Sequence, residues 1–105
     1  MNEQINEQNE TSLPKARLHA TIHGRVQGVS FRYYTIQTAR RLDLTGWVAN
    51  RWDSAVETVA EGSRDTLKEF LSFLREGSPA AFVQKVDHRW EAATGEFDHF
   101  KVRYL

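Results

Sequence analysis

Residues 24–32, Gly-Arg-Val-Gln-Gly-Val-Ser-Phe-Arg, combine residue types that suit the binding of a small anion. Two glycines punctuate this stretch, which joins an alternating, strand-like run to a helix-like one. Such a loop at a helix N-terminus directs several backbone N–H groups toward one point, where the helix dipole also favours negative charge. Arg32 adds a planar guanidinium that can donate to two phosphate oxygens at once. The segment therefore predicts a binding site for a phosphoryl group.

A second block follows at a matching distance. It consists of Gly-Trp-Val-Ala-Asn at residues 46–50, which leads through Asp53 to Val-Glu at 56–57 and Ala-Glu-Gly at 60–62. Together the two blocks resemble the acylphosphatase family, and the resemblance extends over about residues 17–104. It implies a small freestanding enzyme that hydrolyses acyl phosphates to a carboxylate and inorganic phosphate, without a metal or another cofactor.

The resemblance also implies roles for particular side chains. The family's arginine at the position of Arg32 binds the phosphoryl group, and its asparagine at the position of Asn50 positions the attacking water. These roles suit the reaction, because phosphoryl transfer depends on stabilising spread charge and on positioning. The carboxylate is a good leaving group, so no strong general acid is required. The loop residues expected to bind the phosphate are Arg25, Val26, Gln27, Gly28, Val29, Ser30 and Phe31.

Each of these residues also has a simpler interpretation. Arg32 can be a surface group early in a helix, and Asn50 can be a turn former, because asparagine tolerates left-handed geometry. Gln27 and Ser30 can contact the substrate, but we expect them to hold the loop's shape. Trp47 is predicted to pack in the core rather than to bind the acyl group.

Two aromatic residues, Tyr33 and Trp52, are expected at the rim of the substrate pocket. Gly24 and Gly28 are expected to have positive φ or to allow close approach of the phosphate. The hairpin after residue 50 departs from the family's usual Asp-Gly, because Ser54 stands where glycine is common. We expect this change to alter the turn type or to loosen the rim.

Hydrophobic periodicity predicts the elements that position these residues. Alternation over residues 17–23 predicts a half-buried strand, and apolar residues at helical spacing predict a helix over 30–42. A second helix is predicted between a Ser63 N-cap and a Gly77 C-cap. Further strands are predicted over residues 44–50, 55–60, 82–90 and 97–104. This order predicts an α+β fold, a ferredoxin-like β-α-β-β-α-β sandwich with two helices on one face of an antiparallel sheet.

Composition limits the class of protein. The 105 residues suit a single domain, predicted over 15–105, after an Asn/Gln/Glu-rich leader over 1–14 that we expect to be disordered. The absence of cysteine excludes disulfides, thiolate metal sites and cysteine nucleophiles. No apolar run approaches the roughly 20 residues of a membrane span. We therefore expect a cytoplasmic protein that does not bind membranes. The oligomeric state has no signal in the sequence, and a monomer is the default expectation.

Charge is unevenly distributed although the net charge is zero. Residues 15–51 hold seven Lys or Arg and one acidic residue, which would attract an anionic substrate modestly. The four histidines lack the spacing of a metal site or a catalytic triad. Glu57 and Glu61 alternate with Thr58 and Ala60 on a predicted strand and are expected on a solvated face.

Three other functions deserve comparison. A non-catalytic phosphate-binding or accessory module, related to acylphosphatase-like domains of larger carbamoyl-transfer proteins, is the main alternative. RNA binding is disfavoured, because the aromatic strand motif of RNA-recognition modules is missing, and we expect no nucleic-acid partner. A P-loop nucleotide enzyme is excluded, because no Gly-Lys-Ser/Thr ends the glycine loop.

Overall fold

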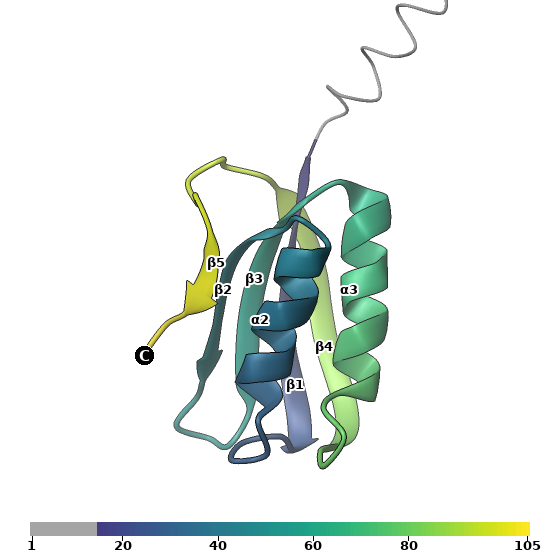
Figure 1. Ribbon diagram of the computed structural model, residues 1–105, viewed down its shortest axis with the longest axis vertical. Helices are drawn as coiled ribbons and strands as arrows, with labels where there is room; N and C mark the ends of the chain where they lie inside the picture. Colours follow the sequence, from purple (N-terminus) through teal and green to yellow (C-terminus); the bar gives the residue numbers. More distant parts are fainter. Residues whose placement is uncertain (1–14) are drawn as a thin grey trace, which may run out of the picture.

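The computed structural model describes residues 15–105, so the predicted disordered leader lies outside the described residues. The elements appear in the predicted order, with shifts only at their ends (Figure 1). None of the described helices is long and apolar enough to cross a membrane. The elements are β1 (Ala16–Arg25), α2 (Phe31–Arg41), β2 (Thr45–Asn50), β3 (Val56–Gly62), α3 (Arg64–Glu76), β4 (Phe82–Ala92) and β5 (Phe100–Val102).

The sheet has the strand order β4-β1-β3-β2-β5. The first four strands pair antiparallel, as predicted, whereas β5 pairs parallel to β2. The sheet is therefore mixed, and the expectation of a wholly antiparallel sheet is corrected at this edge. This follows from the strand directions, because β4 runs in the opposite direction to β2. The chain reverses direction after β4, so the strand that it adds beside β2 is parallel to β2.

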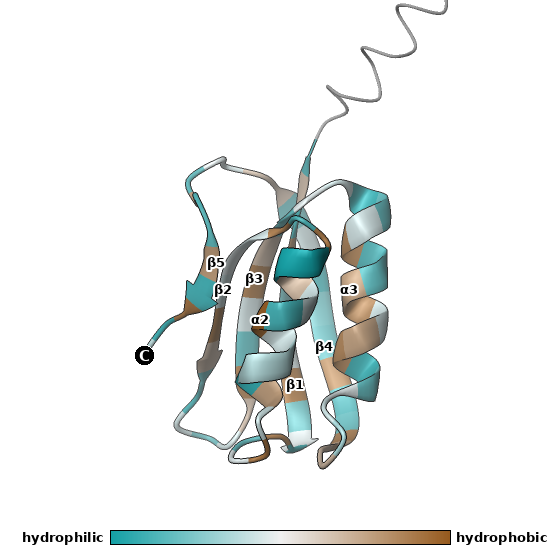
Figure 2. Cartoon of the chain, viewed as in Figure 1, coloured by the Kyte–Doolittle hydropathy of each residue, from teal (hydrophilic) through white to brown (hydrophobic). Residues whose placement is uncertain are grey.

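Both helices cover one face of the sheet (Figure 1), and each carries hydrophobic and hydrophilic segments along its length (Figure 2). The buried apolar residues of both helices lie in one core cluster with those of the strands. Between these layers lies the main core, in which Phe70 and Phe100 pack edge to face with ring centroids 5.8 Å apart. The predicted caps of the second helix are present, because Ser63 precedes α3 and Gly77 follows it. This two-layer arrangement confirms the ferredoxin-like sandwich.

A bulge at the end of β1 starts the glycine loop. The pairing of β1 with β4 shifts between His23 and Gly24. A Cβ on Gly24 would lie 2.2 Å from the carbonyl oxygen of Phe82, so only glycine fits this close backbone approach. Gly24 and Gly28 have φ values of 133° and 74°, as predicted.

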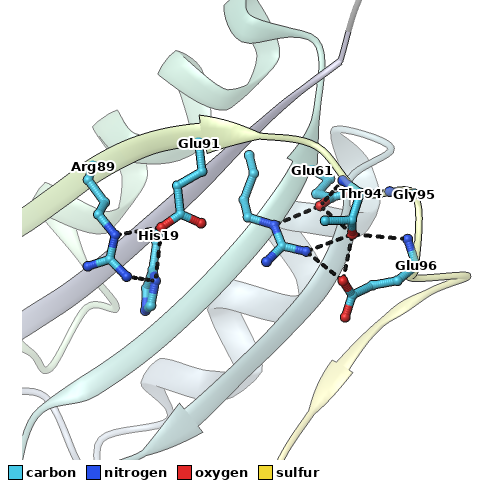
Figure 3. A network of polar contacts seen from close by, with 8 residues as sticks. His19, Glu61, Arg89, Glu91, Thr94, Gly95 and Glu96 are labelled. Atoms are coloured by element: carbon cyan, nitrogen blue, oxygen red, sulfur yellow. Dashed lines mark hydrogen bonds and ion pairs between the residues drawn. The ribbon is translucent and has the colours of Figure 1, made fainter.

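The other face of the sheet carries a buried carboxylate. Glu61 is only 3% exposed, so the prediction that it lies on a solvated face is wrong. The connection from β4 to β5 folds over this face, where the N–H groups of Thr94 and Gly95 donate to the Glu61 carboxylate at 2.9 and 3.0 Å (Figure 3). Arg17 Nε donates to the same carboxylate at 2.7 Å. Glu57 is half-buried rather than fully solvated.

These contacts change the acidity of Glu61. Burial by itself would raise the pKa of this carboxyl, but the N–H groups of Thr94 and Gly95 and the Arg17 guanidinium outweigh burial and lower it. A lowered pKa means that the ionised form stabilises the fold. That stabilisation is present above the ordinary carboxyl pKa and is lost as the pH falls through the lowered one.

We predict that Glu61→Gln lowers the free energy of unfolding by about 1–3 kcal/mol at neutral pH, because the amide retains the shape but not the charge. The difference from wild type should begin to shrink as the pH falls below the ordinary carboxyl value of 4.5, and it should be lost as the pH falls through the lowered pKa, where folded wild-type Glu61 also becomes neutral. Urea unfolding across this pH range measures both effects. Glu69→Gln, at an exposed position of α3, is the matched control and should change little. A difference that stays constant with pH would mean that the charge of Glu61 is not the cause.

Candidate active site

A cavity of about 170 Å³ lies where the glycine loop, the start of α2 and the end of β2 meet. These segments lie at the same end of the sheet (Figure 1). The cavity is lined by Val26, Gly28, Ser30, Phe31, Arg32, Tyr33 and Asn50. The structure thus brings Arg32, Asn50 and four of the predicted loop residues together in one small space.

The other three predicted loop residues lie around this cavity and do not line it. Arg25 is the last residue of β1 and is exposed, on a separate hollow that it shares with His23 and Gln84. The backbone of Val29 is held by a residue outside the glycine loop, because Ser78 Oγ donates to the Val29 carbonyl oxygen at 2.9 Å. Gln27 points toward the hairpin between β2 and β3.

The N-terminus of α2 is left open for a ligand. Ser30 takes the N-cap position with φ 62°, and within residues 15–105 its side chain forms no capping hydrogen bond. The first turn of α2 also contains no acidic residue. By contrast, Ser63 caps α3 by accepting from the N–H of Thr66, and Asp65 lies in the first turn of that helix. The two helices differ as expected if the first N–H groups of α2 bind an exogenous anion.

Asn50 presents an unpaired oxygen. Its Oδ1 is buried and, among the residues that the structure describes, has no hydrogen-bond partner. A buried polar oxygen without a partner costs free energy, and such a cost is typical of functional sites rather than of purely structural positions. The turn-former interpretation does not fit, because Asn50 ends β2 and the positive φ of the hairpin (77°) belongs to Ser54.

Gln27 ties the glycine loop to this hairpin. Its Nε2 donates to the carbonyl oxygens of Arg51 at 2.7 Å and Ala55 at 2.9 Å, which supports the interpretation that it holds the loop's shape. Ser54 adopts the left-handed conformation usually taken by glycine, so the turn forms despite the substitution. The two residues that flank the turn, Arg51 and Ala55, are thereby fixed relative to the loop.

Ion pairs also stabilise the hairpin between β2 and β3. They lie on the open face of the sheet, which is the face that the two helices do not cover. Arg51 contacts Asp53 and Glu57, each at 3.1 Å, and the Arg51 guanidinium lowers the pKa of the Asp53 carboxyl. His19 Nε2 lies 2.5 Å from the other oxygen of Glu57. Asn50 directly precedes Arg51 in the chain. The contacts of Arg51 therefore help to fix the backbone that positions the Asn50 side chain.

Arg32 keeps its charge available for a ligand. In the described part of the chain no carboxylate forms an ion pair with it. Its guanidinium carbon instead lies 5.9 Å from the ring centroid of Tyr104. A cation held by an aromatic ring and facing a cavity is well suited to an anion.

Of the aromatic residues predicted near the substrate, Tyr33 lines the cavity and Trp52 does not. Trp47 is 8% exposed and packs with Ala49 and Val59 on the open face of the sheet, under the guanidinium of Arg103. A larger hollow of about 460 Å³ also lies beside Trp47. Trp47 is therefore packed in a small core of its own, on the other side of the sheet from Asn50.

Comparison with known proteins shows to which family this chain belongs. A sequence model of the acylphosphatase family matches residues 18–102. The chain belongs to the acylphosphatase family. An acylphosphatase of Syntrophotalea carbinolica is 46% identical over 88 residues, which are 84% of this chain and 96% of that protein. The crystal structure of the Bacillus subtilis acylphosphatase superposes with a TM-score of 0.82 at 34% identity, covering 85% of this chain and 99% of that one.

The same acylphosphatase fold also occurs within a larger protein. Full-length HypF, solved in a phosphate- and nucleotide-bound form, matches with a TM-score of 0.77 at 27% identity. The match covers 87% of this chain but only 12% of that chain. The relatives that are matched almost over their whole length are acylphosphatases, so the accessory-module interpretation is not favoured.

Sequence reasoning missed the contact of Tyr104 with Arg32. It also did not identify the partners of Gln27, the carbonyl oxygens of Arg51 and Ala55. The Gln27 contact has only an indirect signal, because Gln27 and Asn50 belong to the two sequence blocks whose resemblance implies one shared site. The Tyr104 contact has no local signal, because it depends on the pairing of β5 with β2.

We predict that Gln27→Ala lowers the free energy of unfolding by about 1–2 kcal/mol and weakens the binding of inorganic phosphate severalfold, because the loop loses its attachment to the hairpin. Urea unfolding and calorimetric titration with phosphate measure the two effects. Gln37→Ala, at an exposed position of α2, is the matched control and should alter neither. Unchanged phosphate affinity in Gln27→Ala would show that this attachment does not shape the site.

Proposed function

We propose that this acylphosphatase hydrolyses acyl phosphates at the cavity between the glycine loop, α2 and β2, with Arg32 and Asn50 as its catalytic residues. The observation that carries the proposal is the convergence on one cavity of the N-terminus of α2, Arg32 and Asn50; within residues 15–105 that N-terminus has no side-chain cap, the guanidinium has no ion-pair partner and the Asn50 Oδ1 has no hydrogen-bond partner. The relatives named above, which are acylphosphatases, support the same activity.

In this proposal the phosphoryl group occupies the position that the loop and helix N–H groups face. Arg32 donates to two of its three oxygens, and the N–H groups at the start of α2 donate to the same group. Because these donors are already in place, they stabilise the charge that spreads over the equatorial oxygens in the transition state. The donors supply the positive charge themselves, so the mechanism invokes no metal.

Asn50 orients the nucleophile. Its side-chain amide forms a hydrogen bond with a water in the cavity, which leaves a lone pair of that water directed at phosphorus. The water oxygen forms a bond to phosphorus as the bond to the bridging oxygen breaks, and the bond electrons leave with the carboxylate. The cavity lining contains no carboxylate or histidine in the described residues, so a phosphoryl oxygen takes the water's proton in this mechanism.

The cytoplasmic location, the monomeric state and the lack of a nucleic-acid partner stay predictions from sequence. Sedimentation of the purified protein and a nucleic-acid binding assay test the last two. None of them is required by the proposed reaction, which needs only a small acyl phosphate and water.

The decisive experiment measures phosphate release from acetyl phosphate and benzoyl phosphate in the presence of EDTA. Turnover of either supports the proposal, and a large loss on adding EDTA would reveal a metal requirement. A folded protein that binds phosphate but releases none would instead support the accessory-module interpretation.

We predict that Arg32→Ala lowers kcat/KM about 10³-fold or more, the effect typical of an arginine that stabilises transition-state charge. Inorganic phosphate should also bind more weakly, because the guanidinium contacts the ground state as well. Arg41→Ala, at the exposed end of the same helix, is the matched control and should be nearly as active as wild type. Comparable activity of the two variants would remove Arg32 from the mechanism.

We predict that Asn50→Ala lowers kcat about 10²-fold or more, because the attacking water loses its position. Inhibition by inorganic phosphate should change little, since Asn50 contacts the water rather than the phosphoryl group in this mechanism. Steady-state kinetics with phosphate as a competitive inhibitor separates the two constants. A variant with near-normal kcat would contradict the water-positioning role.

A further inference from the structure

We propose that Tyr104 and Tyr33 form a subsite for the acyl group, and that this subsite favours aromatic acyl groups over small ones. The inference rests on the proposed function, since it names the class of substrate that the same cavity prefers. It is carried by two exposed rings from segments far apart in the sequence: the Tyr104 ring lies beside the Arg32 guanidinium, and Tyr33 lines the same cavity as Arg32.

The segment after β5 continues along β2, toward the end of that strand that carries Asn50. Val102 pairs with Val48 in the parallel register, and the N–H of Arg103 donates to the carbonyl oxygen of Val48 at 2.9 Å. The chain therefore keeps following β2 beyond the end of β5. The same register brings Tyr104 level with Asn50, the last residue of β2.

Alternation along this segment decides which way Tyr104 faces. Val102 packs against the main core on the helix side of the sheet. Arg103 lies on the open face, over the ring of Trp47. Tyr104 is then on the helix side again, in agreement with its ring centroid 5.9 Å from the guanidinium carbon of Arg32.

Tyr33 supplies the second ring from α2. It follows Arg32 in the helix and lines the cavity directly. Its ring packs edge to face on Tyr34, with centroids 5.4 Å apart, so its position is fixed by a neighbour on the same helix. Tyr33 and Tyr104 thus contribute aromatic surface to the surroundings of Arg32.

Both rings are available to a ligand. Tyr33 is 59% exposed and Tyr104 is 82% exposed, in a domain whose large core aromatics are almost fully buried. The acyl group of a substrate is joined to phosphorus through one oxygen and one carbonyl carbon. With the phosphoryl group held by Arg32, the acyl substituent must therefore lie close to whatever surrounds that guanidinium.

The chemistry of the subsite selects flat apolar groups. An aromatic substituent can pack edge to face or offset on tyrosine rings, which adds to the free energy gained from burying its area. It also covers ring surface that is otherwise exposed to water. An acetyl group has only a methyl to bury, so it gains little from the same rings.

Binding of two non-hydrolysable analogues, benzoylphosphonate and acetylphosphonate, tests the subsite without relying on turnover. We expect wild type to bind benzoylphosphonate about tenfold more tightly, and Tyr104→Ala to lose most of this preference by weakening only the benzoyl compound. Tyr33→Ala should reduce the preference in the same way, whereas Tyr104→Phe should keep it, because the ring remains. Calorimetric titration measures each dissociation constant.

Inorganic phosphate and an unrelated aromatic residue are the controls. Phosphate should bind Tyr104→Ala as it binds wild type, and Phe82→Ala, which removes an exposed ring on β4 at the opposite edge of the sheet from β5, should keep the preference. If Tyr104→Ala weakens phosphate, acetylphosphonate and benzoylphosphonate equally, Tyr104 positions Arg32 and the acyl subsite is disproved. An unchanged preference in both tyrosine variants disproves it as well. Failure of the proposed function is a separate result, namely no phosphate release by a wild type that binds these analogues.

Discussion

The N–H groups at the start of α2 must stay without a protein partner if an anion is to bind them, and the surrounding structure follows from this constraint. Ser30 occupies the N-cap position but, in the described residues, its side chain caps nothing. The loop is therefore shaped from outside the cavity, by Gln27 on the hairpin and by Ser78 on the carbonyl oxygen of Val29. A loop held in this way keeps its donors preorganised, so binding an anion costs little reordering.

Keeping polar groups unpaired destabilises the fold, and other parts of the molecule offset that loss. The left-handed Ser30 and the buried Oδ1 of Asn50 each cost on the order of 1–3 kcal/mol. On the open face of the sheet, the carboxylate of Glu61 accepts from two N–H groups and from Arg17. This network, in which the polar groups have hydrogen-bond partners, lies on the face of the sheet opposite the helices and away from the cavity. The stability that it contributes offsets the polar groups that the cavity leaves without partners.

The sequence predicts what depends on local pattern. Periodicity and caps placed both helices and the first four strands, and the two motif blocks placed Arg32 and Asn50 close to one another. Alternation along β3 wrongly predicted a solvated Glu61, because alternation tells which face a residue is on and not what covers that face. The covering connection between β4 and β5 has no periodic pattern, so its position over Glu61 could be known only from the structure.

The parallel pairing of β5 with β2 links these two faces of the sheet. One face of the segment carries Arg103 over Trp47, and the other carries Tyr104 to Arg32. The connection that buries Glu61 leads directly into β5 and so contributes to holding that strand at the sheet edge. The surroundings of Arg32 therefore depend on the closure of the sheet edge, and the motif that contains Arg32 specifies only part of the site.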